Sequence, residues 1–182
     1  MGWRALLVEP YPPAVKNLEE NLQENRLTKI VPYAVSAEDS CSKVKINWHG
    51  VFEGLEVEAK PVMQVLREFA AQQPGGKISI IKIDIDGMDN EIASAIDFSE
   101  FETRLVILEI DSSNIKILTD QSEIMLLKGY VPILHSGNVY YCRREDLEQW
   151  LFVPRKSQSA SLTVIAKTPK YENPASRHSE RR

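Results

Sequence analysis

Short apolar runs alternate with amphipathic segments along most of the chain. Residues 5–8 and 105–110 are almost continuously apolar, which is typical of strands that are covered on both faces of a sheet. Residues 78–87 contain five isoleucines and predict the strongest strand of the chain. Residues 30–35 predict another strand, in which Pro32 lacks a backbone donor and favours a sheet edge. These four runs predict the strands of a mostly parallel sheet.

The segments between these strands have helical patterns. Pro12 and Pro13 suit the first turn of a helix, because that turn needs no backbone donor. Val15, Leu18 and Leu22 then form one apolar stripe among polar residues. Further helices are expected at residues 62–71, 88–96, 122–128 and 145–151.

Antiparallel pairing is predicted in two places. Residues 43–48 alternate polar and apolar side chains, and residues 56–62 can pair with them or lead into the next helix. Residues 131–134 and 139–142 flank the sequence Ser-Gly-Asn and predict a hairpin. Strands that alternate with helices before a hairpin predict an α/β layered sandwich.

The length and charge of the chain define its organisation. The 182 residues suit one compact domain, expected at residues 1–152. Residues 153–182 carry seven Lys or Arg against two Glu, a charge of +5, which leaves −9 for the rest of the net −4. This basic tail is expected to be disordered, although residues 162–166 can add a strand. The acidic body argues against a nucleic-acid partner, because phosphate contacts need a basic face.

Other classes of protein are disfavoured by what the sequence contains. No apolar run reaches the roughly 20 residues of a membrane span, and the first residues do not resemble a secretory signal. Cys41 and Cys142 are too few for a disulfide framework, so the expected setting is the reducing cytoplasm. Without clusters of Cys or His, no metal site is expected.

Carboxylates end three of the predicted strands. Parallel strands present their carboxyl ends at one edge of a sheet, where ligands bind. Burial of unpaired carboxylates is unfavourable, so this edge predicts a ligand rich in hydroxyl groups or positive charge. Other roles remain open, namely a Lys or Arg partner for Asp84, a helix cap for Asp86 or Asp89 and a loop position for Asp111. The strand-end acids are Glu9, Asp84, Asp86, Glu109 and Asp111.

The order and spacing of four segments resemble the FkbM-type methyltransferases over about residues 4–150. The segments are LLVEPYPPAVKNLEENLQENRL, VPYAVSAEDS, IIKIDIDGMDNEIASAI and LVILEID. In that family a strand that ends in Glu-Pro precedes a helix, and an IKID-x-(E/D)-G strand follows later. The resemblance implies a Rossmann-like class I fold, S-adenosylmethionine as the cofactor and methylation of a hydroxyl on a small molecule or sugar.

The resemblance also implies roles for single residues in cofactor binding. Glu9, followed by Pro10, would hold the ribose hydroxyls of S-adenosylmethionine. Ala34, Val35 and Ser36 would line the adenine.

The acceptor side is implied to lie at the end of the strand at residues 78–87. Asp84 would lie under the methionine end of the cofactor or under the acceptor, and Asp86 and Gly87 would shape the acceptor side. Asp86 stands where the family more often has Glu. Methyl transfer needs an aligned acceptor and a route for its proton, so Asp84 or Asp86 would orient or deprotonate the hydroxyl.

One element of the family pattern is absent. No glycine-rich loop follows a strand, and the first strand of the family, expected between the strands that bear Glu9 and Asp84, has no counterpart before residue 5. The chain is therefore expected to be truncated at its N-terminus, to close the gap in another way, or to form homo-oligomers.

Three alternative functions remain. A nicotinamide oxidoreductase could also use Glu9 on a ribose, but it too needs the missing glycines to bind a pyrophosphate. A second alternative is a catalytically inactive methyltransferase-like binding module. The third is a haloacid-dehalogenase-type phosphatase with Asp84 as nucleophile and Asp86 as general acid around magnesium, which the later strand-end acids match poorly.

Overall fold

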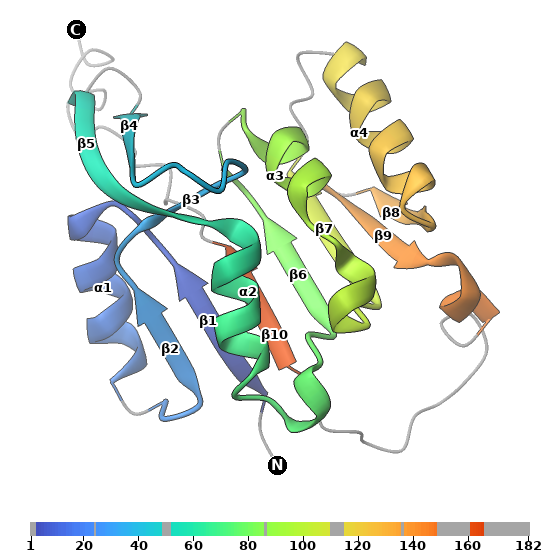
Figure 1. The fold of residues 1–182 in the computed structure, drawn as a ribbon, viewed down its shortest axis with the longest axis horizontal. Coiled ribbons are helices and arrows are strands. Elements are labelled where there is room, and N and C mark those ends of the chain that lie inside the picture. Colours follow the sequence, from blue (N-terminus) through green and yellow to red (C-terminus); the bar gives the residue numbers. More distant parts are fainter. Residues whose placement is uncertain are drawn as a thin grey trace, which may run out of the picture.

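A seven-stranded, mostly parallel sheet forms the centre of the molecule. The computed structural model describes residues 3–23, 25–48, 52–85, 87–109, 115–135, 137–148 and 161–165. The strands lie in the order β2-β1-β10-β6-β7-β9-β8, in which β9 is antiparallel to both of its neighbours (Figure 1). The expected α/β class is thus confirmed. The strands are β1 (Arg4–Val8), β2 (Thr28–Val31), β6 (Ile80–Ile83), β7 (Leu105–Glu109), β8 (Tyr130–His135), β9 (Asn138–Arg143) and β10 (Ser161–Ile165).

A second sheet has three strands in the order β3-β5-β4. The strands β4 (Lys43–Trp48) and β5 (Phe52–Pro61) form the expected antiparallel pair, and β3 (Ala34–Ser36) is parallel to β5. The prediction of a single strand at residues 30–35 is wrong, because β2 ends at Val31 and β3 belongs to the other sheet. The break falls at Pro32, which cannot donate to a ladder.

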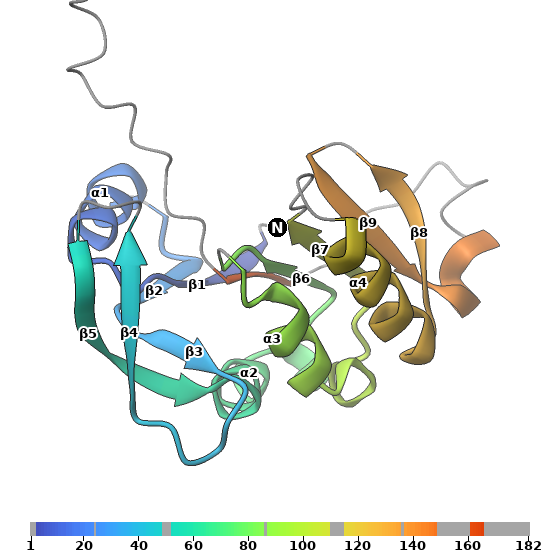
Figure 2. The same ribbon diagram turned by 90° about the horizontal axis from the view of Figure 1, so that it is seen from above.

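Four α-helices and three 3₁₀ turns join the described strands. The helices α2, α3 and α4 lie on one face of the large sheet, and α1 lies on the other face (Figure 2). One expectation needs correction, since α4 begins seven residues before position 122. The helix expected at residues 145–151 is preceded by a 3₁₀ turn and lies partly outside the described residues. The bounds are α1 (Pro12–Leu22), α2 (Val62–Ala70), η1 (Pro74–Gly76), α3 (Asp89–Ala95), η2 (Phe98–Phe101), α4 (Ile115–Leu127) and η3 (Arg144–Asp146).

The hydrophobic core lies between the large sheet and helices α2 to α4. Leu66 from α2, Ile81 and Ile83 from β6 and Ile92 from α3 have no exposed surface. Each such side chain contributes about 1.5–3 kcal/mol through burial. Alternate residues of β6 face the other side of the sheet, where Ile80 is only half-buried. The described side chains of β6 are thus more deeply buried on the side of α2.

The C-terminal strand β10 lies at the centre of the large sheet. It pairs in parallel with β1 on one side and with β6 on the other (Figure 1). The sequence left this segment as either tail or strand, and the structure has a strand. Its position is the one in which the sequence analysis expected a missing strand.

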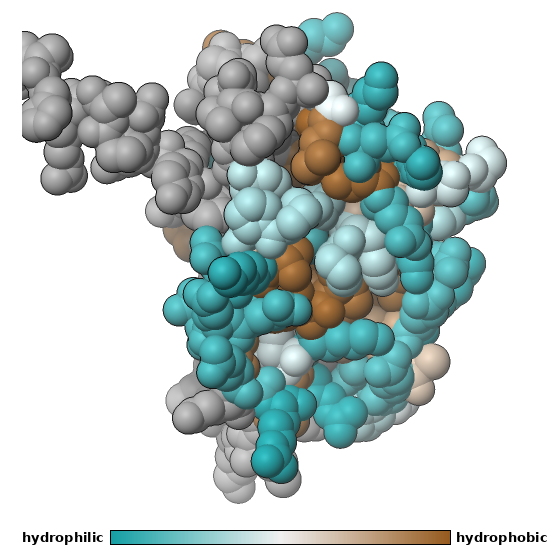
Figure 3. Space-filling view, turned by 90° about the vertical axis from the view of Figure 1, so that its left-hand side faces the viewer, coloured by the Kyte–Doolittle hydropathy of each residue, from teal (hydrophilic) through white to brown (hydrophobic). Residues whose placement is uncertain are grey.

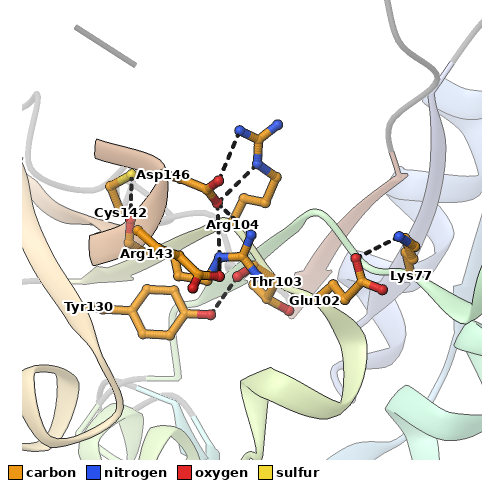
Figure 4. A network of polar contacts seen from close by, with 9 residues as sticks. Lys77, Glu102, Thr103, Arg104, Tyr130, Cys142, Arg143 and Asp146 are labelled. Atoms are coloured by element: carbon orange, nitrogen blue, oxygen red, sulfur yellow. Dashed lines mark hydrogen bonds and ion pairs between the residues drawn. The ribbon is translucent and has the colours of Figure 1, made fainter. Parts of the chain in front are cut away.

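An ion-pair network fixes the amino edge of the large sheet. Arg104, just before β7, and Arg143, at the end of β9, both contact the carboxylate of Asp146 (Figure 4). The Arg104 Nε donates to Asp146 Oδ2 at 3.1 Å and the Arg143 Nε donates to the same oxygen at 2.9 Å. Next to them the Tyr130 hydroxyl donates to the Thr103 carbonyl at 2.5 Å. Asp146 is buried, so the network is shielded from water.

This network predicts a large stability difference between two isosteric substitutions. Asp146→Asn removes the charge that two partly buried guanidinium groups share, which should cost about 2 kcal/mol. Glu102→Gln breaks the exposed pair with Lys77, also drawn in Figure 4, and should cost less than about 1 kcal/mol. Urea unfolding of both variants measures the difference. Equal costs would show that the buried network does not hold this edge.

Candidate carboxylate site at the edge of the sheet

Glu9 follows β1 directly and has no exposed surface. Its backbone N–H donates to the Val31 carbonyl at 3.1 Å, which ties it to the end of β2. The Tyr11 N–H donates to Oε1 of Glu9 at 2.8 Å. The other carboxyl oxygen, Oε2, has no hydrogen-bond partner among the described residues. Such an oxygen is costly to bury, and a hydroxyl or N–H donor from a ligand would offset that cost.

The surroundings of Glu9 change its acidity. Burial raises the pKa of the Glu9 carboxyl from 4.5 to about 7, and the hydrogen bond from Tyr11 only partly opposes this rise. The carboxyl is therefore about half protonated near neutral pH. A buried strand-end acid with a strongly raised pKa is a candidate for a functional role.

Asp84 follows β6 at the same edge of the sheet and is also buried. Its Oδ2 forms an ion pair with the Lys82 ammonium group, two residues earlier on β6. This is the basic partner that the sequence left open for Asp84. The pair neutralises the charge of Asp84 and holds its carboxylate in one orientation.

The distance between the two acids follows from strand register. Val8 and Ile83 both stand opposite Ile165 of β10. Glu9 and Asp84 come one residue later in the chain, so both lie just beyond the same edge of the sheet. Two strand spacings of about 4.8 Å place their backbones about 10 Å apart.

Asp89 is a third buried acid, which the sequence analysis considered only as a helix cap. No side chain caps α3, whose cap residue is Met88. The Asp89 Oδ2 accepts a hydrogen bond from the Ile85 N–H at 3.4 Å, and Oδ1 has no partner among the described residues. Burial, with a contribution from the charge of Asp84, raises the pKa of Asp89. The position of Asp89 in the sequence does not indicate that its carboxylate accepts a hydrogen bond from the Ile85 backbone, just after β6.

The residues expected around the adenine form the buried strand β3. Ala34, Val35 and Ser36 form β3, which follows the carboxyl end of β2, and all three are buried. The Ser36 hydroxyl accepts a hydrogen bond from the Glu38 N–H at 3.0 Å. Pro10 is half-buried beside Glu9. A ligand could contact Glu9 or β3 only after the atoms that cover them move.

The expected acceptor side is only partly described. Asp86 and Asp111 lie outside the described residues. Gly87 is exposed and has a φ of 95°, a backbone conformation that glycine adopts without strain. Glu109 ends β7 and is half-buried. Among the described residues, no group of three or more His, Cys, Asp or Glu side chains is placed to hold a metal ion.

A surface hollow of about 640 Å³ lies at the far end of α1 rather than at the acidic edge. Figure 3 shows the left-hand side of the molecule in Figure 1, where apolar patches lie between polar residues. The hollow is open and its lining is mainly polar, in contrast to the buried carboxylates at the sheet edge. Its lining residues are Glu20, Asn21, Leu22, Gln23 and Asn25.

Comparison with known proteins identifies no family for this chain. No protein-family model matches the chain, and no curated protein is significantly similar to it. In the described part of the chain, no helix is long and apolar enough to cross a membrane.

The raised pKa of Glu9 predicts how stability depends on pH. Between pH 4.5 and about 7 the folded protein holds a proton on Glu9 that the unfolded chain has released. The free energy of unfolding should therefore fall as the pH rises through this range, by on the order of 3 kcal/mol. Glu9→Gln should remove this fall, and Glu19→Gln on the exposed side of α1 should keep it. Urea unfolding from pH 4 to 8 measures it, and parallel curves for the wild type and Glu9→Gln would contradict the assignment.

Proposed function

We propose that the chain is an S-adenosylmethionine-dependent methyltransferase of the class I type, acting on a hydroxyl of a small molecule or sugar. The observation that carries this proposal is the buried Glu9, whose Oε2 has no partner among the described residues. A ribose offers two adjacent hydroxyl donors, and a strand-end acid is the usual group that binds them in nucleotide-binding α/β folds.

The connections of the sheet support a ligand at this edge. From β1 the chain continues outward to β2, whereas from β6 it continues in the opposite direction to β7. Open α/β sheets bind ligands outside the carboxyl ends of the strands, at the point where the strand order reverses. Glu9 and Asp84 stand on either side of that point.

The charge of the edge also suits the proposed cofactor. Glu9, Asp84 and Asp89 place three carboxyl groups near the strand ends, and Lys82 offsets one of them. S-adenosylmethionine carries a positive sulfonium, so the remaining acidic groups would attract it. The ribose hydroxyls would donate to carboxylate oxygens that have no partner among the described residues, and the sulfonium would be attracted by the negative charge.

The described residues define what the chain would do in the reaction. The cofactor would supply an activated methyl group on its sulfonium. Glu9 would hold the ribose, and the pair of Lys82 and Asp84 would fix a carboxylate near the other end of the ligand. Asp84, or Asp86 in the part of the chain that is not described, would orient the acceptor hydroxyl or take its proton.

Access to the site is part of the proposal. Glu9 has no exposed surface, so binding requires local opening above the strand ends. The apparent affinity would then be lower than the intrinsic affinity by the fraction of molecules that are open.

Calorimetry with S-adenosylmethionine and S-adenosylhomocysteine tests this function. The wild type should bind both, and Glu9→Ala should weaken binding by roughly tenfold or more, because two charge-assisted hydrogen bonds are lost. Glu19→Ala, on the exposed side of α1, serves as the matched control and should bind as the wild type does. Absence of binding to the wild type, or equal binding to Glu9→Ala, would refute the proposal.

A further inference from the structure

Within the described residues, the two parts of the large sheet share no direct strand pairing. β1 pairs with β2 and β10, and β6 pairs with β7 and β10, but β1 and β6 do not pair with each other. The five residues of β10 therefore provide the main-chain link across the centre of the sheet. The last described segment of the chain therefore joins two parts of the sheet, β2-β1 and β6-β7-β9-β8, which are formed by earlier segments.

The edges of β1 and β6 form a slot that matches β10 in length. All five residues of β10 stand opposite residues of β1, from Arg4 to Val8. The last four, Leu162 to Ile165, also stand opposite Ile80 to Ile83 of β6. The segment Ser-Leu-Thr-Val-Ile contains no proline, so each residue has a backbone donor for a ladder. Thr, Val and Ile also favour extended backbone.

The path of the chain allows this strand to come from the same molecule. β9 ends at the amino edge of the sheet, where the Arg143 N–H donates to the Arg104 carbonyl at 3.0 Å. The strand β10 begins at the same edge, with Ser161 opposite Arg4. From β9 to β10 is three strand spacings, about 15 Å. A chain of the length of residues 147–160 can span up to roughly 45 Å when extended, which exceeds this distance.

The slot also determines the geometry of the carboxylates. Glu9 and Asp84 each follow a residue that stands opposite Ile165. With β10 in place they lie two strand spacings apart. Without it, no backbone hydrogen bond would hold their strands in register.

We propose that the gap between β1 and β6 is a strand-binding slot, and that its occupant is Ser161–Ile165 of the same chain, whose docking assembles the carboxylate edge. This inference does not rest on the proposed function. It gives residues 161–165 a structural role inside the sheet, which the basic residues before and after them in the sequence do not share.

Disulfide trapping in the full chain tests the slot. With Cys41 replaced by Ser and Cys142 by Ala, Arg4→Cys and Ser161→Cys place two thiols on paired residues. Adjacent strands bring their Cα atoms within disulfide range. Arg4→Cys with Thr163→Cys is the register control, because a shift of two residues moves the Cα atoms to about 8 Å. Ile80→Cys with Leu162→Cys tests the other edge of the slot.

The proposal expects an intramolecular disulfide in both registered pairs, formed at least tenfold faster than in the register control as an order-of-magnitude expectation. Covalent dimers as the main product would show that a second copy fills the slot, which overturns the same-chain occupant. Absence of a disulfide, or equal rates in the registered and control pairs, overturns the slot itself.

Hydrogen exchange in single variants provides a second test. Thr163→Pro removes one ladder donor in the middle of β10, and Thr163→Val keeps it. Amide exchange in both β1 and β6 should become roughly tenfold faster or more in the proline variant, while β8 and β9 keep their protection. Unchanged protection in β1 and β6 would overturn the proposal.

Discussion

Parallel pairing of β10 with both β1 and β6 is the constraint on which the rest of this structure depends. A central parallel strand has to satisfy its backbone groups on both sides, and an empty centre would leave two rows of N–H and C=O groups unpaired. The sheet resolves this with a segment from the far end of the chain. Both parts of the sheet and the edge that they form together follow from that pairing.

The chemistry of the edge follows from where the strands stop. β1 and β6 end beside β10, and the next residue on each is an acid held in the dry interior. Asp84 is compensated by Lys82, whereas among the described residues Glu9 is compensated only by one backbone N–H. The difference explains why burial raises the pKa of Glu9 so far. It also makes Glu9, rather than Asp84, the group with the most to gain from a ligand donor.

Much of this arrangement could be predicted from the pattern of residues. Apolar runs identified β1 and β7, and an isoleucine-rich run identified β6. The acids at the ends of these strands indicated a shared edge, because parallel strands all present the same end there. The division of residues 30–35 into β2 and β3 was missed, since hydrophobic periodicity does not show that a proline sends the chain into another sheet. The buried position of Asp89 was missed because it depends on a turn of the chain rather than on spacing. The partners of β10 were also beyond prediction, because strand propensity does not specify which edges a strand will join.

The most direct test of the account is the pattern of short proton–proton distances across the centre of the sheet, measured by nuclear Overhauser effects on the isotope-labelled full chain. The account predicts backbone contacts from Leu162 to Ala5 on one side and to Ile80 on the other, in the register of two parallel ladders. Direct backbone contacts between β1 and β6, with none to residues 161–165, would contradict it.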